Sequence, residues 1–180
     1  MKKYTIAIVL TIAVFNTNAQ TQALPKDWTC QPASEFNLKI CFPQQWRFDD
    51  TTKGARFFIF TPSESDTDRF VQNFNLQASK LGDDEKSMTA KQYTDLNLKE
   101  IKNTLTEFKQ ASLKEVIIKG VKWSELIYTG KIESIPYKLK FVQRYTIYKG
   151  NAFVITYTSD AERKDIFYPV ALKVLNTASL

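Results

Sequence analysis

Residues Phe36 to Phe42 alternate between apolar and polar side chains, and this period of two is typical of a strand with one buried face. Pro43 ends this segment, and glycines separate several of the later ones. We expect six further strands of apolar and aromatic character, at 56–60, 69–79, 113–119, 121–129, 137–148 and 152–158. Lys149-Gly150-Asn151 lies between the last two and is typical of a tight hairpin.

The hydrophobic period changes after Gly82. Thr89 and Gln92 have the Ser/Thr-x-x-Glu/Gln spacing of a capping box, which satisfies free amides in the first turn of a helix. An apolar stripe at spacings of three and four follows, and it predicts a helix at about 89–109. The stripe consists of Leu98, Ile101, Leu105 and Phe108.

A second Ser/Thr-x-x-Glu pair, Ser159 with Glu162, predicts a C-terminal helix at about 160–177. Pro169 is expected to split or restart it, because proline removes a helical hydrogen bond. One helix between groups of neighbouring strands favours an antiparallel α+β fold over a parallel nucleotide-binding sheet. We expect about six to seven strands in the sheet. Residues 20–35, which carry Pro25 and Pro32, show no period and are expected to be irregular.

The first nineteen residues have the layout of a secretory signal peptide. Lys2 and Lys3 precede the apolar run Thr5–Phe15, and small residues stand before a cleavage point at Gln20. The run is shorter than the roughly 20 residues that a transmembrane helix needs, so an uncleaved anchor is the less favoured alternative. No cysteine stands at the cleavage point, as a lipoprotein would require. We therefore expect a periplasmic or secreted protein.

Cleavage leaves residues 20–180, enough for one domain, at 36–180, after the irregular segment. The whole chain carries a formal charge of +6, and losing two lysines with the signal peptide leaves +4. Between Lys99 and Lys149, eleven basic residues accompany five glutamates. This region is either a set of solvated faces or a docking surface for an acidic partner. Nucleic acid is not expected as a partner outside the cytoplasm.

Cys30 and Cys41 are the two cysteines of the chain. Thiols oxidise outside the cytoplasm, so we predict a Cys30–Cys41 disulfide, with two buried free thiols as the alternative. The spacing is not Cys-x-x-Cys, which argues against redox catalysis.

The chemistry of the chain excludes several functional classes. It contains no histidine, which removes Ser-His and Cys-His nucleophilic sites and the commonest zinc ligand. Its five glycines form no phosphate-binding loop. Glu64, Asp66 and Asp68, and then Asp83–Glu85, either bind Ca²⁺ or Mg²⁺ weakly or are solvated turns. We expect no resident metal or cofactor.

Aromatic residues are plentiful, and most lie on the predicted buried faces. A minority could line a groove for a lipid tail, a peptide or a glycan. Trp28 and Trp46 flank the first strand and are expected to be partly exposed. With the basic residues Lys138, Lys140 and Arg144 they form the predicted partner surface.

Two segments resemble the PsbP-like superfamily, which includes PsbP and DcrB-type bacterial envelope proteins. The first is Ile40–Trp46, with the sequence Ile-Cys-Phe-Pro-Gln-Gln-Trp. The second is the closing region: Gly120-x-x-x-Ser-Glu125, Gln143, Gly150–Thr158 and the C-terminal helix. The similarity covers residues 36–178 and implies an α/β/α sandwich around an antiparallel sheet. Metal binding through histidine, found in some plant members, does not carry over to a chain without histidine.

The resemblance implies a non-enzymatic binding or assembly module. The leading hypothesis is therefore an exported domain that binds a protein partner in the bacterial envelope. The first alternative is a lipid or small-ligand carrier with an aromatic-lined groove. A hydrolase that uses two facing carboxylates is the third.

Overall fold

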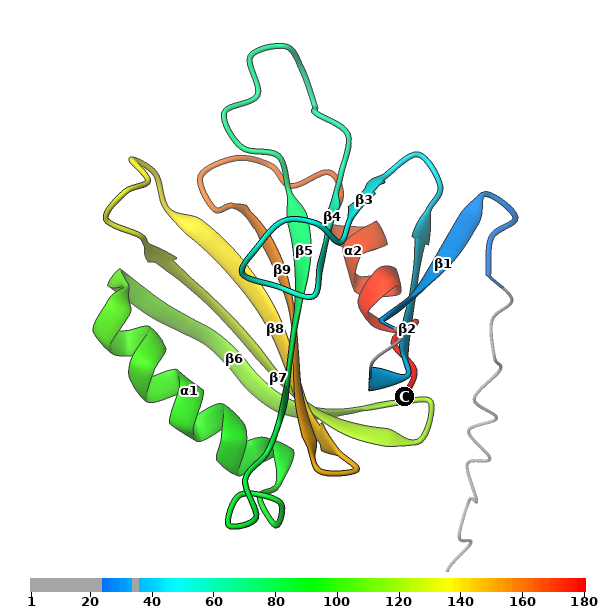
Figure 1. Ribbon diagram of the computed structural model, residues 1–180. Helices are drawn as coiled ribbons and strands as arrows, with labels where there is room; N and C mark the ends of the chain where they lie inside the picture. The colour runs from blue at the N-terminus through cyan, green and yellow to red at the C-terminus, as the bar shows by residue number, and fades with distance from the viewer. Residues whose placement is uncertain (1–23, 34–35) are drawn as a thin grey trace, which may run out of the picture.

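The central sheet has seven antiparallel strands in the order β3-β4-β5-β9-β8-β7-β6 (Figure 1). The computed structural model describes residues 24–33 and 36–180; the predicted signal peptide lies outside them. The strands are β3 Arg47–Asp49, β4 Phe57–Phe60, β5 Asn73–Lys80, β6 Thr106–Ile118, β7 Val121–Lys131, β8 Leu139–Tyr148 and β9 Asn151–Asp160. The predicted antiparallel α+β fold is confirmed.

Each face of this sheet is covered by a different layer (Figure 1). Helix α1, Ala90–Thr104, packs on one face over β6, β7 and β8. Helix α2, Tyr168–Leu175, and a small antiparallel sheet of β1, Trp28–Ala33, and β2, Leu38–Pro43, cover the other. Two apolar cores result. The larger lies under α2 and β2, and the smaller lies under α1.

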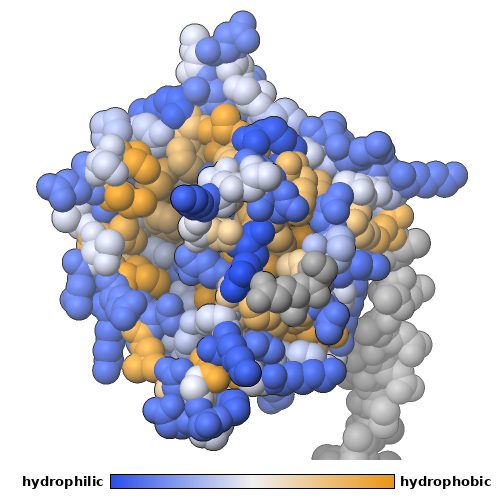
Figure 2. Space-filling view, viewed as in Figure 1, coloured by the Kyte–Doolittle hydropathy of each residue, from blue (hydrophilic) through white to orange (hydrophobic). Residues whose placement is uncertain are grey.

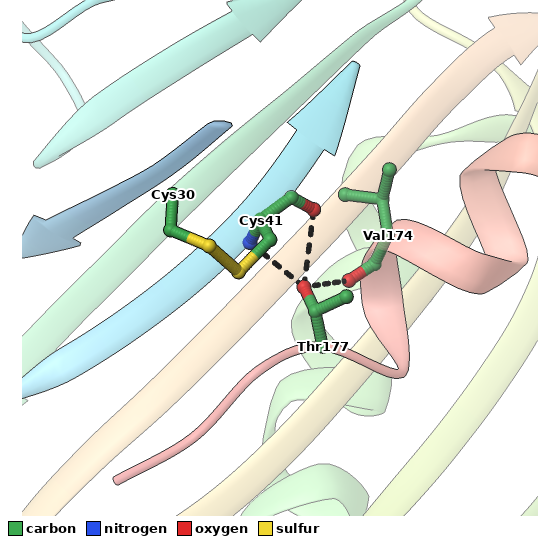
Figure 3. Close-up of a disulfide and its surroundings, with 4 residues drawn as sticks. All are labelled: Cys30, Cys41, Val174 and Thr177. Carbon is green, nitrogen blue, oxygen red and sulfur yellow. Dashed lines mark hydrogen bonds between the residues drawn. A yellow bond between two sulfur atoms is a disulfide. The ribbon is translucent and has the colours of Figure 1, made fainter. Parts of the chain in front are cut away.

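Strand β1 falls in the segment 20–35 that the sequence predicted to be irregular, so that prediction is wrong for residues 28–33. β1 pairs with β2, and Cys30 stands directly opposite Cys41, where a disulfide joins them (Figure 3). The predicted disulfide is confirmed. Pro32 fits because β1 is an edge strand, where a missing backbone donor is tolerated.

The C-terminal tail fixes the disulfide hairpin to the rest of the molecule. The hydroxyl of Thr177 accepts the backbone N–H of Cys41 at 2.8 Å and lies 2.7 Å from the carbonyl oxygen of Val174 (Figure 3). The backbones of Lys39 and Ser179 also exchange hydrogen bonds, at 2.8 and 2.9 Å. The C-terminal tail is therefore packed against strand β2.

Helix α1 begins where the capping box predicted and ends earlier than expected. The Thr89 hydroxyl accepts the Gln92 N–H at 3.2 Å, and the Gln92 side chain accepts the Thr89 N–H at 2.9 Å. The helix stops at Thr104, so the predicted extension to residue 109 is wrong. Strand β6 begins at Thr106, and Glu107 takes a positive φ of 51°. Residues after Thr104 therefore pair with β7 as a strand, although their apolar spacing suits a helix.

The C-terminal helix is shorter than predicted. Residues 160–167 are not helical, and α2 spans Tyr168–Leu175 with Pro169 in its first turn, where proline is tolerated. The predicted capping box of Ser159 and Glu162 does not form, because Ser159 belongs to β9. Among the described residues, no helix is long and apolar enough to cross a bilayer.

The predicted hairpin at Lys149-Gly150 is present between β8 and β9. Both residues have positive φ, 48° and 74°, as the two central residues of a type I′ hairpin turn require. Lys119 and Gly120 repeat this geometry between β6 and β7, with φ of 48° and 81°.

Candidate binding surface

Trp46 does not lie at a partner surface. Its side chain is only 4% exposed, and its ring packs against Phe74 and Phe167 with centroids 5.9 and 6.0 Å apart. The sequence prediction that Trp46 is partly exposed is wrong. The short strand β3 that follows Trp46 was not predicted, and it directs the chain back over the larger core.

Arg144 is also buried, at 4% exposure, and forms an ion pair with the buried carboxylate of Glu125. Its Nε and Nη2 atoms both lie 2.8 Å from Glu125 Oε2, and Nη1 donates to Asn176 Oδ1 at 2.8 Å. Burial lowers the pKa of Arg144, while the charge and hydrogen bond of Glu125 oppose that shift. Arg144 therefore holds α2 to the sheet and is not available to a partner.

The other three predicted surface residues contact different parts of the molecule. Lys138 pairs with Glu107, with Nζ 2.8 Å from Oε2. Lys140 Nζ stands 3.4 Å from the centroid of the Tyr168 ring, and burial lowers its pKa. Trp28 is half-buried against the larger core. The structure does not bring the five predicted residues together into one surface.

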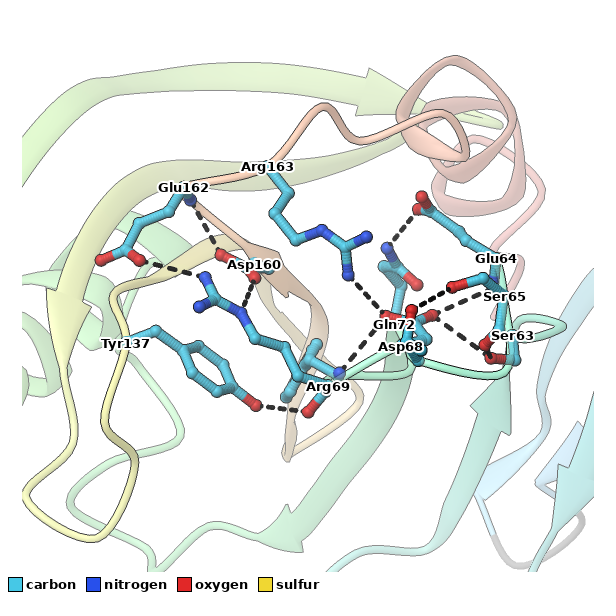
Figure 4. Close-up of polar contacts among 12 residues, drawn as sticks. Ser63, Glu64, Ser65, Asp68, Arg69, Gln72, Tyr137, Asp160, Glu162 and Arg163 are labelled. Carbon is cyan, nitrogen blue, oxygen red and sulfur yellow. Dashed lines mark hydrogen bonds and ion pairs between the residues drawn. The ribbon is translucent and has the colours of Figure 1, made fainter.

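The acidic loop of residues 61–72 is held by a network of ion pairs and hydrogen bonds (Figure 4). Arg69 binds Asp160 at 2.8 Å and Glu162 at 3.0 Å, and its carbonyl oxygen accepts the Tyr137 hydroxyl at 2.7 Å. Asp68 pairs with Arg163 at 3.1 Å. These contacts tie the loop that rises above the sheet in Figure 1 to the end of β9.

Some of the remaining acidic side chains also have protein partners, whereas Asp66 and Asp84 form no hydrogen bond or ion pair with the described residues. Glu64 accepts a hydrogen bond from Gln72 at 2.8 Å, and Asp83 pairs with Lys86. Within residues 24–33 and 36–180, no group of three acidic or cysteine side chains is placed to hold a metal ion.

Glu107 forms a pH-dependent contact with Lys131 and Lys138. Hydrogen bonds from Lys131 and Lys138 lower its pKa from 4.5 to about 2. A lowered folded-state pKa stabilises the folded protein above the unfolded value, and this stabilisation disappears as pH falls through the folded value. The wild type is therefore expected to resist urea more than Glu107→Gln above pH 4.5, and the two should converge toward pH 2.

Urea midpoints at several pH values check this prediction. Glu133→Gln, an exposed glutamate in the next loop without an ion pair among the described residues, is the matched control. A difference between Glu107→Gln and wild type that persists unchanged at pH 2 would contradict the expected contact.

A small cavity opens where the first turn of α1 meets β6 and β7. Its volume is about 210 Å³. It is lined by Ala90, Lys91, Leu113, Lys114, Glu115, Lys122, Trp123 and Ser124. Leu113 and Ala90 supply apolar surface, while the lysines and Glu115 supply polar ends. The cavity therefore suits an apolar side chain that stands next to a polar or charged residue in another molecule.

Ile117 stands beside this cavity and is 68% exposed, more than the other exposed large apolar residues of the described chain. It lies opposite Lys122 in the β6–β7 pair and two positions from Glu115. We call the cavity together with Ile117 the α1–β6 site. Single exposed apolar side chains are common on protein surfaces, so it is the adjoining cavity that makes this place a candidate binding site.

The charge of the α1–β6 site is moderately basic. Lys91 pairs with Asp95 at 2.6 Å and Lys122 with Glu115 at 3.2 Å. Lys114 points to the other face of the sheet, where its Nζ lies 3.2 Å from Glu125 Oε1, so it adds no charge to this site. Lys119, in the adjacent turn, adds another positive charge. An acidic partner is therefore favoured over a basic one.

Two more shallow cavities lie near the other end of the sheet. One, of about 220 Å³, lies between the β1–β2 hairpin and β3–β4, and the other, of about 270 Å³, lies at the ends of β4 and β5. All three volumes are below the roughly 300 Å³ at which pockets for drug-sized ligands begin. They fit side chains better than a lipid.

No family profile and no curated protein matches this sequence. Solved structures do match it, with low identity. PsbP of the cyanobacterium Synechocystis sp. PCC 6803 aligns with a TM-score of 0.61 and 11% identity, over 88% of this chain and 95% of that one. A protein of unknown function from Pseudomonas aeruginosa aligns with a TM-score of 0.59 and 14% identity, over 85% and 96%.

LpqN of Mycobacterium tuberculosis, a protein involved in cell envelope biogenesis, aligns with a TM-score of 0.56 and 17% identity, over 83% of this chain and 86% of LpqN. At such identities the likeness concerns the fold. The chain has the PsbP-like fold that its sequence motifs indicated.

Proposed function

We propose that this chain is an exported PsbP-like domain of the bacterial envelope that acts as a protein-binding or assembly module without catalysis of its own. The single observation that carries the proposal is the α1–β6 site, where exposed Ile117 stands beside a side-chain-sized cavity. The partner segment would insert one apolar side chain into the cavity. Acidic residues on either side of it would face Lys119 and Lys122.

Export is supported by the signal-peptide pattern and by the disulfide, which is stable in an oxidising compartment. The likeness to LpqN, a protein of cell envelope biogenesis, agrees with a role in the envelope. The missing histidine and the engagement of the loop carboxylates in ion pairs favour binding over hydrolysis.

The α1–β6 site can be tested by changing its exposed apolar residue. Mature wild-type protein on a resin is expected to retain a partner from envelope extract, and Ile117→Asp is expected to retain about tenfold less. The new carboxylate would repel an acidic segment, and the apolar contact would be lost. Labelled quantitative mass spectrometry measures the ratio for each retained protein.

Ile166→Asp is the matched control, because Ile166 is 52% exposed on a loop of the opposite layer. It should retain the partner as well as wild type does. Equal loss in both variants, or no protein retained above a charge-matched unrelated resin, would count against the proposal.

A further inference from the structure

The face of the sheet that carries α1 is only partly covered. Helix α1 packs over β6, β7 and β8, which leaves the same face of β4 and β5 without a covering layer. The side chains there are half-buried or exposed: Phe58, Phe60, Asn73, Asn75 and Gln77. We call this set the open half-face. It is separate from the α1–β6 site, which lies at the other edge of the sheet.

Alternation along the two strands produces this surface. The residues between those of the open half-face point to the larger core, where Phe57, Ile59, Phe74 and Leu76 are almost completely buried. The solvated face of an antiparallel sheet usually carries polar residues. Here the outward positions of β4 and β5 combine aromatic rings with amides. Figure 2 shows hydrophilic and apolar surface mixed on this side of the molecule.

The sheet register arranges these groups in a row that crosses the strands. Phe58 on β4 pairs with Asn75 on β5, Asn75 with Thr156 on β9, and Thr156 with Gln143 on β8. Neighbouring strands are about 4.8 Å apart, so the row has one side chain per step of that length. Phe58, Asn75 and Gln143 are half-buried, and Thr156 is 6% exposed. One pyranose unit of an extended oligosaccharide has a similar length. A second row, Phe60–Asn73–Thr158–Phe141, runs beside it.

Hydrogen bonds hold the inner end of the first row in one orientation. The Tyr145 hydroxyl donates to Gln143 Oε1, and Gln143 Nε2 donates to Thr156 Oγ1 at 3.1 Å. This chain of bonds fixes the amide of Gln143, the half-buried member at this end of the row. A binding group whose rotamer is fixed loses less entropy when a ligand arrives.

The outer amides of the row keep their hydrogen-bonding capacity for other molecules. In the part of the chain that the structure describes, neither the Asn75 nor the Gln77 side chain forms a hydrogen bond. Each amide offers two donors and one acceptor oxygen. Phe58 and Phe60 stack on each other with centroids 5.8 Å apart, and Arg47 lies 4.0 Å over the Phe60 ring at the outer edge.

From these features we infer that the open half-face binds a neutral, linear oligosaccharide that lies across the strands. Adjacent sugar hydroxyls both donate and accept, as the amides of Asn75 and Gln77 do. The C–H face of a pyranose ring packs against an aromatic ring such as that of Phe58. The row continues onto Asp49 of β3, whose carboxylate pairs with Arg47 and would repel a polyanionic glycan.

Titration of the ¹⁵N-labelled mature protein with maltohexaose, cellohexaose and chitohexaose, each to about 10 mM, tests this inference by NMR. At least one neutral hexasaccharide is expected to shift the backbone amides of β4 and β5 and the side-chain amides of Asn75 and Gln77. The double variant Asn75→Ala/Gln77→Ala should bind it about tenfold more weakly, because two hydrogen-bonding side chains are lost.

Gln44→Ala/Gln45→Ala is the matched control, because it removes two exposed amides between β2 and β3. This control should bind the hexasaccharide as wild type does, and both double variants should keep the wild-type urea midpoint. Absence of shifts with all three sugars, shifts that map elsewhere, or equal binding by both variants would overturn the inference. Tighter binding of hexagalacturonate than of any neutral sugar would overturn it too.

Discussion

Replacing Glu125 by glutamine is expected to lower the free energy of unfolding by about 3–5 kcal/mol, because Arg144 would then be a buried charge without its counter-ion. Both residues are at most 4% exposed, and Arg144 also binds Asn176 at the end of α2. The substitution keeps the shape of the side chain and removes its charge. Urea unfolding at pH 7 measures the difference.

Lys114→Ala provides the control, because Lys114 contacts the same carboxylate but is largely exposed. Exposed ion pairs contribute little, so this variant is expected to lose about 1 kcal/mol or less. Glu125→Leu with Arg144→Met removes both charges and should recover most of the lost stability. A loss under about 1 kcal/mol for Glu125→Gln would contradict the importance of the buried pair.

Removing the disulfide is expected to lower the free energy of unfolding by about 3 kcal/mol, the chain-entropy value for a loop of this length. Alanine is the suitable replacement at both Cys30 and Cys41, because Cys41 is completely buried and a hydroxyl there would add an unmatched polar group. Urea unfolding of Cys30→Ala/Cys41→Ala against oxidised wild type measures the effect.

Reductant separates the disulfide from the side-chain change. Wild type in excess dithiothreitol should match the double variant to within about 1 kcal/mol, and the variant should not respond to reductant. Two alkylatable thiols in unreduced mature protein would contradict the disulfide. A double variant as stable as the oxidised wild type would show that the hairpin does not need it.

Local patterns predicted the beginning of elements better than their ends. The capping box at Thr89 and Gln92 involves residues three apart, so the sequence alone locates the start of α1. The end of α1 depends on β6 pairing with β7, a contact that the periodicity of residues 98–108 does not contain. The false capping box at Ser159 failed for the same reason, since pairing with β8 carries β9 through to Asp160.

Strand β1 and the burial of two predicted surface residues depend on tertiary contacts. β1 has no hydrophobic period, and its pairing with β2 becomes evident only when Cys30 and Cys41 are placed opposite each other. Arg144 lies on a face of β8 that looks solvated from its lysines, but α2 covers that position. A buried arginine cannot be distinguished from an exposed one before its partner, Glu125, is located.

The α1–β6 site was foreseen only as part of a basic region. The excess of lysines between Lys99 and Lys149 indicated that an acidic partner was chemically reasonable. The cavity itself forms only where the first turn of α1 packs against β6 and β7, and no local sequence pattern predicts this tertiary contact. The strong exposure of Ile117 is likewise invisible in sequence, because the residue continues the apolar run Val116–Ile118.

Photo-crosslinking in the native host tests the central claim, that this domain works by binding a partner through the α1–β6 site. A photoreactive amino acid at position 117 is expected to give one discrete adduct of higher mass, which mass spectrometry identifies as an envelope protein with an acidic segment at the cross-link. The same amino acid at position 166, also exposed, is expected to give none. Adducts from position 166 alone, or no adduct from position 117, would contradict the account.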